Sequence, residues 1–298
     1  MAKLGFLGLG LMGAPMARRL LNAGHEVALW SHTGGKAQKL ASEGKGTACA
    51  TPREVAQQSE CVFLCVGDTE MSRNVLVGKD GVIEGAAAGT IVADASTISP
   101  EGSRKINAEF AAKGIHFLDA PCTGSTPGAT NGTLTFMIGG DQQVFERAKP
   151  WFEPMGKLFY YCGGPGMGLQ AKLTQNLVLA NIMQAFSEGI VLSTKAGIDP
   201  GLMLQILDNS AAKSGLISYK APFILKRDFG TNFSTKWMHK DINLALDSGL
   251  QLEVPMPVTA LTKQMLLATI SKGYGDADFC SLIRTEEEWA GVEVKIRS

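Results

Sequence analysis

The sequence predicts an α/β N-terminal domain over residues 1–163 followed by an all-α C-terminal domain over residues 164–298, with a long helix between them. Three observations lead to this fold class. Short apolar runs alternate with helical stretches in the first half, a cluster of glycines interrupts that rhythm near residue 163, and only helical spacing of apolar residues follows. A chain of 298 residues is also long enough to form two cores, which leaves room for a cleft.

The N-terminal domain is predicted from six apolar runs of strand length. They cover residues 4–9, 26–30, 61–66, 90–93, 115–118 and 133–138. Helical segments lie between them, and the segment 51–54 is typical of a helix start: threonine is the cap, proline takes the first helical position and glutamate the third. This alternation indicates a βα-type sheet domain.

The C-terminal domain is predicted from the change of pattern after the glycine-rich segment 163–168. From about residue 169 to residue 196, apolar residues recur at helical spacing without a proline, which predicts a helix of roughly 40 Å at 1.5 Å per residue. Pro200, Pro222, Pro255 and Pro257 punctuate the later helical segments. No convincing strand alternation follows, so this domain is expected to be all-helical.

The composition limits the kinds of partner and site that we expect for this protein. Lys and Arg together number 28, as do Asp and Glu, so no basic field exists to recruit nucleic acid or an anionic membrane. The six cysteines form no CxxC pair and no zinc spacing, which favours reduced thiols and predicts no metal site. Without a leader pattern or an uninterrupted apolar stretch of membrane length, we expect a soluble cytoplasmic protein.

A glycine-rich turn directly after the first predicted strand is the most specific motif. Gly8 permits a tight turn, Gly10 lets the backbone approach a pyrophosphate, and Gly13 allows close helix–strand packing. This context predicts a Rossmann-type nucleotide site, the alternative being an ordinary glycine-rich turn. The candidate cofactor-binding residues are Gly8, Leu9, Gly10, Leu11, Met12 and Gly13.

The end of the second predicted strand bears on the choice of cofactor. An NAD-binding enzyme often places an acid there for the ribose 2′-hydroxyl, but this chain has Ser31, His32 and Thr33. Without a carboxylate to repel a 2′-phosphate, and with Lys36 close by, the segment favours NADP(H) over NAD(H). Alternatively, Ser31 and Thr33 only cap a short helix.

The long helix opens with Lys172 and Asn176, four residues apart and therefore on one face. A neutral lysine can accept the hydroxyl proton when an alcohol is oxidised, and its ammonium can donate that proton in reduction. The alternative is a solvated helix lysine with a polar neighbour.

A polar, glycine-rich loop from Asp119 to Gly132 follows another predicted strand. Its backbone amides and the Thr123 hydroxyl could bind a carboxylate. The alternative is a plain surface turn.

Taken together, these segments resemble the β-hydroxyacid dehydrogenase family over nearly the whole chain. Four signatures occur in order: GLGLMG, DAPCTGSTPGATNG, GGPGMGLQAKLTQN and KDINLALD. The resemblance implies that Lys172 is the catalytic acid/base and that Asn176 positions the substrate. It also implies that Thr123, Gly124 and Ser125 bind the substrate carboxylate. Thr97 would lie near the nicotinamide, and Lys240 would reach both nicotinamide and substrate.

The resemblance further implies a small carboxylate or aldehyde substrate and a homodimer or homotetramer. The family loop usually reads serine-glycine-glycine, whereas this chain has Thr123, Gly124 and Ser125. The final serine is shared with the glyoxylate/succinic semialdehyde reductase branch, which favours short semialdehydes. An imine reductase of the same fold and a non-catalytic nucleotide-binding module are the alternatives. Imine reductases commonly lack the lysine that stands here as Lys172.

Overall fold

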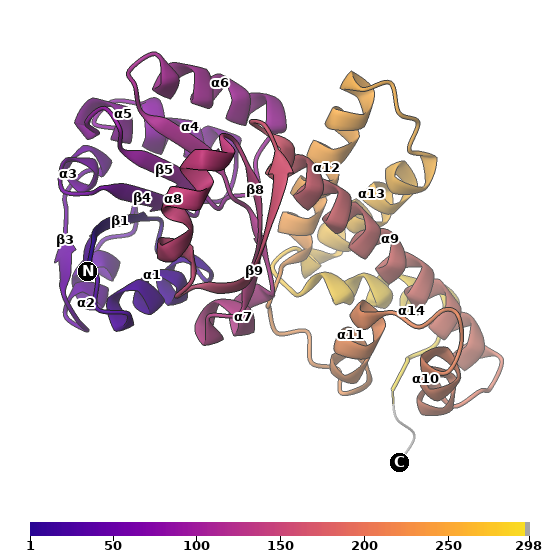
Figure 1. The fold of residues 1–298 in the computed structure, drawn as a ribbon. Coiled ribbons are helices and arrows are strands. Elements are labelled where there is room, and N and C mark those ends of the chain that lie inside the picture. Colours follow the sequence, from indigo (N-terminus) through magenta and orange to yellow (C-terminus); the bar gives the residue numbers. More distant parts are fainter. Residues whose placement is uncertain (296–298) are drawn as a thin grey trace. The chain divides into compact units, whose positions relative to one another are not determined.

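The structure is a computed structural model that describes residues 1–295. It contains two compact units, residues 1–172 and residues 173–298. Figure 1 traces the chain through both of them. The α/β character of the first unit and the helical character of the second confirm the predicted fold class.

The first unit is built on a nine-stranded sheet. Strands β1 to β6 run parallel in the order β3-β2-β1-β4-β5-β6, and β8 follows β6 in the antiparallel sense. The short β7 pairs with β8, and β9 runs parallel to β8. The strands are β1 (Lys3–Leu7), β2 (Glu26–Trp30), β3 (Gly46–Ala48), β4 (Cys61–Leu64), β5 (Ile91–Asp94), β6 (His116–Asp119), β7 (Cys122–Thr123), β8 (Leu134–Gly139) and β9 (Gly156–Gly163).

Helices cover both faces of this sheet (Figure 1). They are α1 (Gly13–Asn22), α2 (Lys36–Ala41), α3 (Pro52–Gln57), α4 (Thr69–Val77), α5 (Val82–Gly85), α6 (Pro100–Ala111), α7 (Ser125–Asn131) and α8 (Gln142–Phe152). Apolar side chains of α1, α2 and α8 pack into one core and those of α3 to α6 into another. Within β4, Phe63 belongs to the first core and Val62 to the second, as the alternation of a strand requires.

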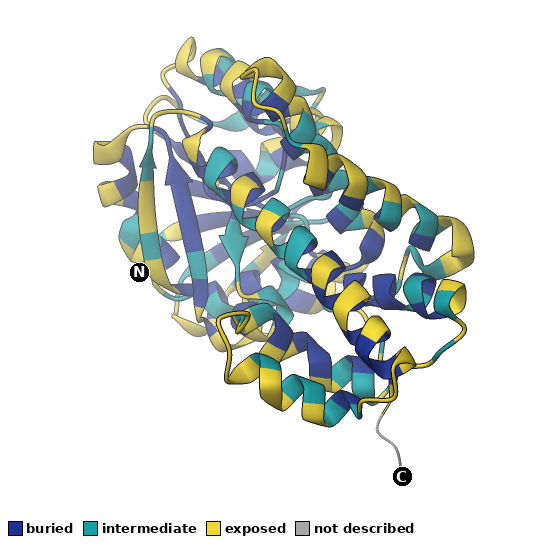
Figure 2. Cartoon of the chain, turned by 90° about the vertical axis from the view of Figure 1, so that its right-hand side faces the viewer, coloured by how far each residue is buried: buried dark blue, intermediate teal, exposed yellow. Residues whose placement is uncertain are grey.

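The second unit is helical. Its elements are the greater part of α9 (Met167–Lys195), then α10 (Pro200–Asp208), α11 (Gly215–Leu225), α12 (Thr235–Gln251), α13 (Pro257–Thr269), η1 (Ile270–Tyr274), η2 (Phe279–Ser281) and α14 (Leu282–Ala290). By length and composition alone, α9 could cross a membrane. Its residues Met183, Phe186 and Ile190, however, pack into the core of this unit, as the core helix of a soluble protein does. Figure 2 shows buried residues among exposed ones on the helices of this unit.

Candidate active site

The glycine-rich turn after β1 has a backbone geometry that requires glycine at positions 8 and 13. Gly8 adopts φ +88°, in the left-handed region, and its N–H donates to Trp30 O over 3.0 Å, which ties the ends of β1 and β2 together. A Cβ on Gly13 would lie 1.9 Å from Gly8 O. A Cβ on Gly10, in contrast, would meet no protein atom within 4 Å. The backbone at Gly10 is therefore open to a close-fitting ligand.

Helix α1 begins at Gly13, directly after this turn. Ala14 N–H donates to Gly10 O in the turn over 3.1 Å. Within residues 1–295, no side chain forms a cap bond to the Met12 end of the helix and no acidic residue lies in its first turn. The N–H groups and the positive end of the helix dipole thus suit a pyrophosphate. Of the two leucines in the turn, Leu9 is buried and Leu11 is exposed.

The segment after β2 lies at the surface. His32, Thr33 and Lys36 are exposed, and the Ser31 hydroxyl oxygen accepts a hydrogen bond from Thr33 N–H over 3.3 Å. The residue that caps α2 is Gly35, with φ +78°, and no side chain within residues 1–295 caps this helix. The alternative prediction, that Ser31 and Thr33 are its caps, is therefore wrong.

A buried hydrogen-bond network around Asp94 lies at the ends of β4 and β5. Asp94 accepts hydrogen bonds from Ser72 Oγ and from Ser96 N–H, the latter over 2.8 Å. Ser96 Oγ in turn accepts the N–H of Val66 over 2.8 Å. Burial raises the pKa of Asp94 to about 6, although these hydrogen bonds lower it. The network fixes the turn that carries Thr97, a half-buried residue one position further on.

The predicted carboxylate-binding segment after β6 is not a plain loop. Cys122 and Thr123 form β7, and the residues from Ser125 onward form α7. The glycine-rich composition that predicted a loop instead serves tight turns: Gly124 adopts φ +123° and Gly132 φ +67°. Ser125 adopts φ +55°, a left-handed conformation that is uncommon for a residue with a Cβ.

Lys172 lies near the start of α9 and is only 9% exposed. Burial raises the pKa of the nearby Cys122 thiol to about 11, and the positive charge of Lys172 opposes this rise. Cys122 directly precedes Thr123, so the structure brings two predicted site residues, Lys172 and Thr123, to one part of the first unit. The prediction of a solvated lysine at this position is wrong.

Asn176, one turn further along α9, is 1% exposed and donates from Nδ2 to Asp241 Oδ2 over 2.5 Å. The other oxygen of Asp241 lies 3.0 Å from Lys240 Nζ. Lys240 also lies over the Trp237 ring, 5.6 Å from its centroid. Asp241 thus links two predicted site residues, although the sequence pattern gave it no role. The feature that could have indicated its role is the position of an acidic residue next to Ile242, on the face of α12 that is buried.

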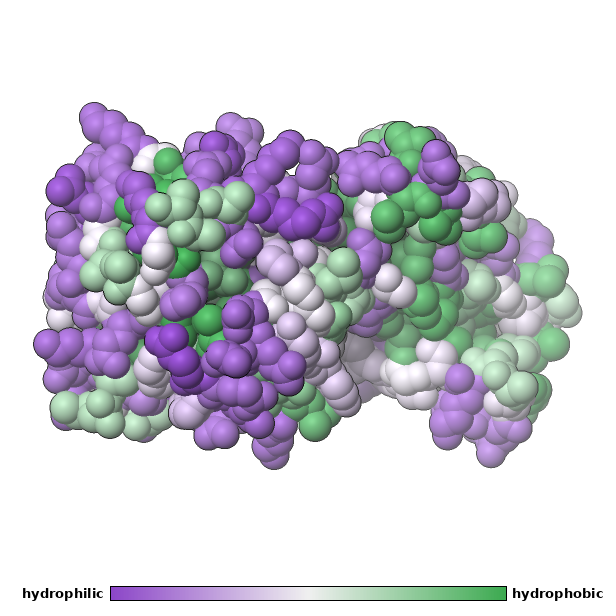
Figure 3. All heavy atoms as spheres, turned by 45° about the horizontal axis from the view of Figure 1, so that its top comes forward, coloured by the Kyte–Doolittle hydropathy of each residue, from purple (hydrophilic) through white to green (hydrophobic). Residues whose placement is uncertain are grey.

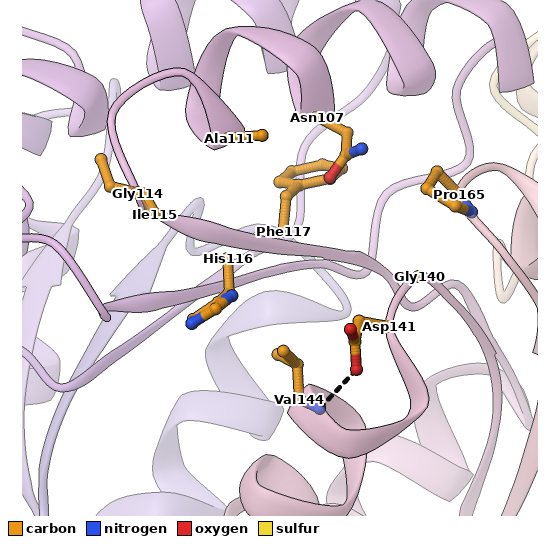
Figure 4. Close-up of a pocket in the computed structure, with 10 residues that line it drawn as sticks. All are labelled: Asn107, Ala111, Gly114, Ile115, His116, Phe117, Gly140, Asp141, Val144 and Pro165. Carbon is orange, nitrogen blue, oxygen red and sulfur yellow. Dashed lines mark hydrogen bonds between the residues drawn. The ribbon is translucent and has the colours of Figure 1, made fainter.

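A separate groove of about 480 Å³ lies between α6 and α8. Asn107 and Ala111 come from α6, Phe117 from β6 and Val144 from α8 (Figure 4). None of the predicted site residues lines it. The carboxylate of Asp141 at its edge already accepts the N–H of Val144, as the first-turn cap of α8. This groove is therefore not part of the candidate site.

Two protein-family models match this chain. Residues 3–164 match the family described as the NAD binding domain of 6-phosphogluconate dehydrogenase. Residues 166–285 match the family described as NAD-binding of NADP-dependent 3-hydroxyisobutyrate dehydrogenase.

Individual relatives match over almost their full length. The chain is 35% identical to 2-(hydroxymethyl)glutarate dehydrogenase of Eubacterium barkeri, over 98% of this chain and 97% of that protein. It is 35% identical to glyoxylate/succinic semialdehyde reductase 1 of Arabidopsis thaliana, over 94% and 97%. A structure of Mycobacterium tuberculosis 3-hydroxyisobutyrate dehydrogenase with L-serine superimposes with a TM-score of 0.89 at 30% identity, covering 96% of this chain and 99% of that one.

Proposed function

Because the chain belongs to the β-hydroxyacid dehydrogenase family and is an NAD(P)-dependent dehydrogenase or reductase acting on CH–OH groups, we propose that it interconverts a short hydroxy acid and its aldehyde. The substrates favoured are glyoxylate, succinic semialdehyde and related aldehyde acids of similar size. The observation that carries the proposal is the buried Lys172, whose charge reaches the segment that begins at Cys122. A buried amine beside a carboxylate-binding segment suits proton transfer to a small acid.

In this mechanism Lys172 Nζ donates the proton to the carbonyl oxygen during reduction and accepts the hydroxyl proton during oxidation. Asn176 orients the substrate, and its own amide is oriented by Asp241. The hydroxyls of Thr123 and Ser125 and the N–H groups of Gly124 and Ser125 hold the substrate carboxylate. These roles rest on the family signatures and on the burial and contacts of each residue.

The turn after β1 and the N-terminus of α1 would hold the pyrophosphate of the cofactor. The open space at Gly10 and the uncapped start of α1 support this assignment. When bound, the nicotinamide supplies or accepts the hydride. Thr97 and Lys240 would, by the family signatures, be near the nicotinamide, and Ser31, His32, Thr33 and Lys36 would bind the adenosine 2′-phosphate. An imine reductase and a non-catalytic module are not favoured, since the named relatives over most of the chain are dehydrogenases or semialdehyde reductases.

A substrate panel tests the proposal. Purified enzyme is mixed with NADPH and glyoxylate, succinic semialdehyde, methylmalonate semialdehyde or tartronate semialdehyde, and oxidation of NADPH is followed by absorbance. Turnover with at least one of these aldehyde acids is expected. Tight NADPH binding without turnover on the whole panel would contradict the proposed reaction.

The choice of cofactor gives a specific prediction. The kcat/KM value should favour NADPH over NADH by at least roughly tenfold, about 1.4 kcal/mol, because hydroxyls and a cation can bind a 2′-phosphate without a charge clash. Ser31→Asp should invert the preference, since an acid accepts hydrogen bonds from the ribose diol and repels the phosphate. Steady-state kinetics with both cofactors measure this. Equal constants for the two cofactors in the wild type would refute the assignment of this segment.

Ser125 gives a second prediction, in which stability and activity change in opposite directions. Ser125→Gly should raise the free energy of unfolding by up to about 1 kcal/mol, because glycine adopts the left-handed conformation without strain. It should also lower kcat/KM for the aldehyde acid, because the serine hydroxyl is lost. Chemical denaturation and kinetics measure the two effects.

Asp80→Gly is the matched control for Ser125→Gly. Asp80 also adopts a left-handed conformation, with φ +54°, in the turn between α4 and α5. This variant should gain stability without any change in kinetics. Unchanged kcat/KM in Ser125→Gly would show that the Ser125 hydroxyl has no part in the substrate site.

We further propose a cytoplasmic homodimer or homotetramer. Figure 3 shows hydrophobic surface gathered on the helical unit, whereas the first unit presents mainly hydrophilic atoms in this view. The exposed apolar residues of the helical unit include Leu192, Leu202, Leu250, Leu252, Val258 and Leu261. Apolar surface of this kind is typical of an interface between subunits. Light scattering of the purified protein measures the mass.

A further inference from the structure

Asp119 is a buried carboxylate that the proposed mechanism does not use. It is the last residue of β6 and is 1% exposed. Gly166 N–H donates to its Oδ1 over 2.7 Å, and Leu169 N–H donates to its Oδ2 over 2.9 Å. Gly166 directly precedes α9 and Leu169 lies in its first turn, 47 and 50 residues further along the chain than Asp119. The carboxylate therefore joins the sheet to the first turn of α9.

This arrangement differs from the other helix caps of the first unit. The first N–H groups of a helix have no partner within the helix, and a neighbouring side chain usually takes them. Thr51, Asp68, Ser99 and Asp141 do so for α3, α4, α6 and α8, and each directly precedes the helix that it caps. The cap of α9 comes instead from a strand, so it determines where the helix begins relative to the sheet as well as satisfying its N–H groups.

Two glycines let the start of α9 approach the sheet closely. A Cβ on Gly139 of β8 would lie 2.4 and 2.6 Å from the two oxygens of Asp119. A Cβ on Gly168 of α9 would lie 2.4 Å from Met137 O. With no side chain between the backbones, the first turn of α9 has little freedom to shift against β6 and β8.

Lys172 follows Leu169 by three residues, about one helical turn. The position of its backbone is therefore determined by the contact between Asp119 and the first turn. We propose that Asp119 is a positioning residue for catalysis, which holds the start of α9 so that the Lys172 amine lies where the substrate proton is transferred. The inference rests on the proposed role of Lys172. A displacement of about 1 Å in a catalytic group can cost 10²-fold in rate.

The test compares two carboxylates that cap helices. Asp119→Asn keeps the shape of the side chain but turns an N–H donor toward one of the two N–H groups. Asp141→Asn makes the same change at the cap of α8, whose Val144 contact is drawn in Figure 4, and serves as the matched control. For each variant we would measure the melting temperature, the NADPH dissociation constant by fluorescence titration, and kcat per NADPH-binding site.

Asp119→Asn is expected to lower kcat by about 100-fold, with the NADPH dissociation constant within about twofold of the wild type. Asp141→Asn should lower only the melting temperature. In a Lys172→Ala background, Asp119→Asn should cause less than about threefold further loss, because both substitutions act through one side chain. Asp119→Ser, which leaves room for a water molecule, replaces Asp119→Asn in the same comparison if the latter does not fold.

The outcomes separate the inference from the proposed function. Wild-type kcat per site in Asp119→Asn, or losses that multiply in the double variant, would overturn the positioning role and leave a structural cap. An active Lys172→Ala enzyme would overturn the proposed role of Lys172 itself. Loss of NADPH binding in Asp119→Asn would also overturn the inference, because the carboxylate would then act through the cofactor site.

Discussion

Replacing Lys172 with alanine should lower kcat by about 10²–10⁴-fold while leaving the NADPH dissociation constant almost unchanged. The side chain is assigned to the substrate proton and has no part in holding the dinucleotide. Steady-state kinetics with the best aldehyde acid and fluorescence titration with NADPH measure the two quantities.

Two other variants on α9 serve as comparisons for Lys172→Ala. Lys195→Ala changes an exposed lysine at the far end of the same helix and should leave kcat unchanged. Asn176→Ala should be milder than Lys172→Ala and chiefly raise KM, because the proposed role of the amide is to position the substrate and not to transfer a proton. If Lys172→Ala keeps more than half of the wild-type kcat, the lysine has no place in the mechanism.

Replacing Gly10 with alanine should weaken NADPH binding by about 100-fold, roughly 3 kcal/mol, without lowering the melting temperature. The added methyl group meets no protein atom within 4 Å, so any clash must be with a ligand. A glycine-to-alanine change at a compatible position otherwise stabilises a protein slightly. Fluorescence titration and thermal unfolding separate the two effects.

Gly215→Ala is the control for the Gly10 variant, since its Cβ also meets nothing within 4 Å and it lies at the start of α11. It should change neither NADPH binding nor stability by much. Gly13→Ala should behave differently from both, because its Cβ would lie 1.9 Å from Gly8 O and must distort the turn. Undiminished NADPH affinity in Gly10→Ala would place the pyrophosphate elsewhere.

Most of the fold could be predicted from the sequence because buried strands and helices impose apolar periodicities. The six predicted runs correspond to β1, β2, β4, β5, β6 and β8. Strand β9 was not predicted, although residues 158–162 form an apolar run. It lies at the edge of the sheet and exposes Leu158 and Tyr160, so this run does not mark a buried strand. Strand β3 was missed because three residues are too few to form a pattern.

Only some residues of the candidate site could be recognised from the sequence, and the reason is physical. Residues that need a special backbone, such as Gly8, can be recognised from a short motif because few residues tolerate that conformation. Asp119 and Asp241 could not be recognised in this way. Their contacts reach 47 and 65 residues along the chain, and sequence spacing reports only neighbours within one element. The same limit left the burial of Lys172 open until the fold was known.

The exposure of the segment that follows β2 has an evolutionary consequence. His32, Thr33 and Lys36 are exposed, so none of them contributes to a core. Substitutions there change stability little, which lets a lineage exchange one dinucleotide for the other without first acquiring compensating mutations. The buried carboxylate at the end of β6 has no such freedom. Cofactor choice should therefore vary readily among descendants of this chain, whereas the attachment of α9 to the sheet should persist.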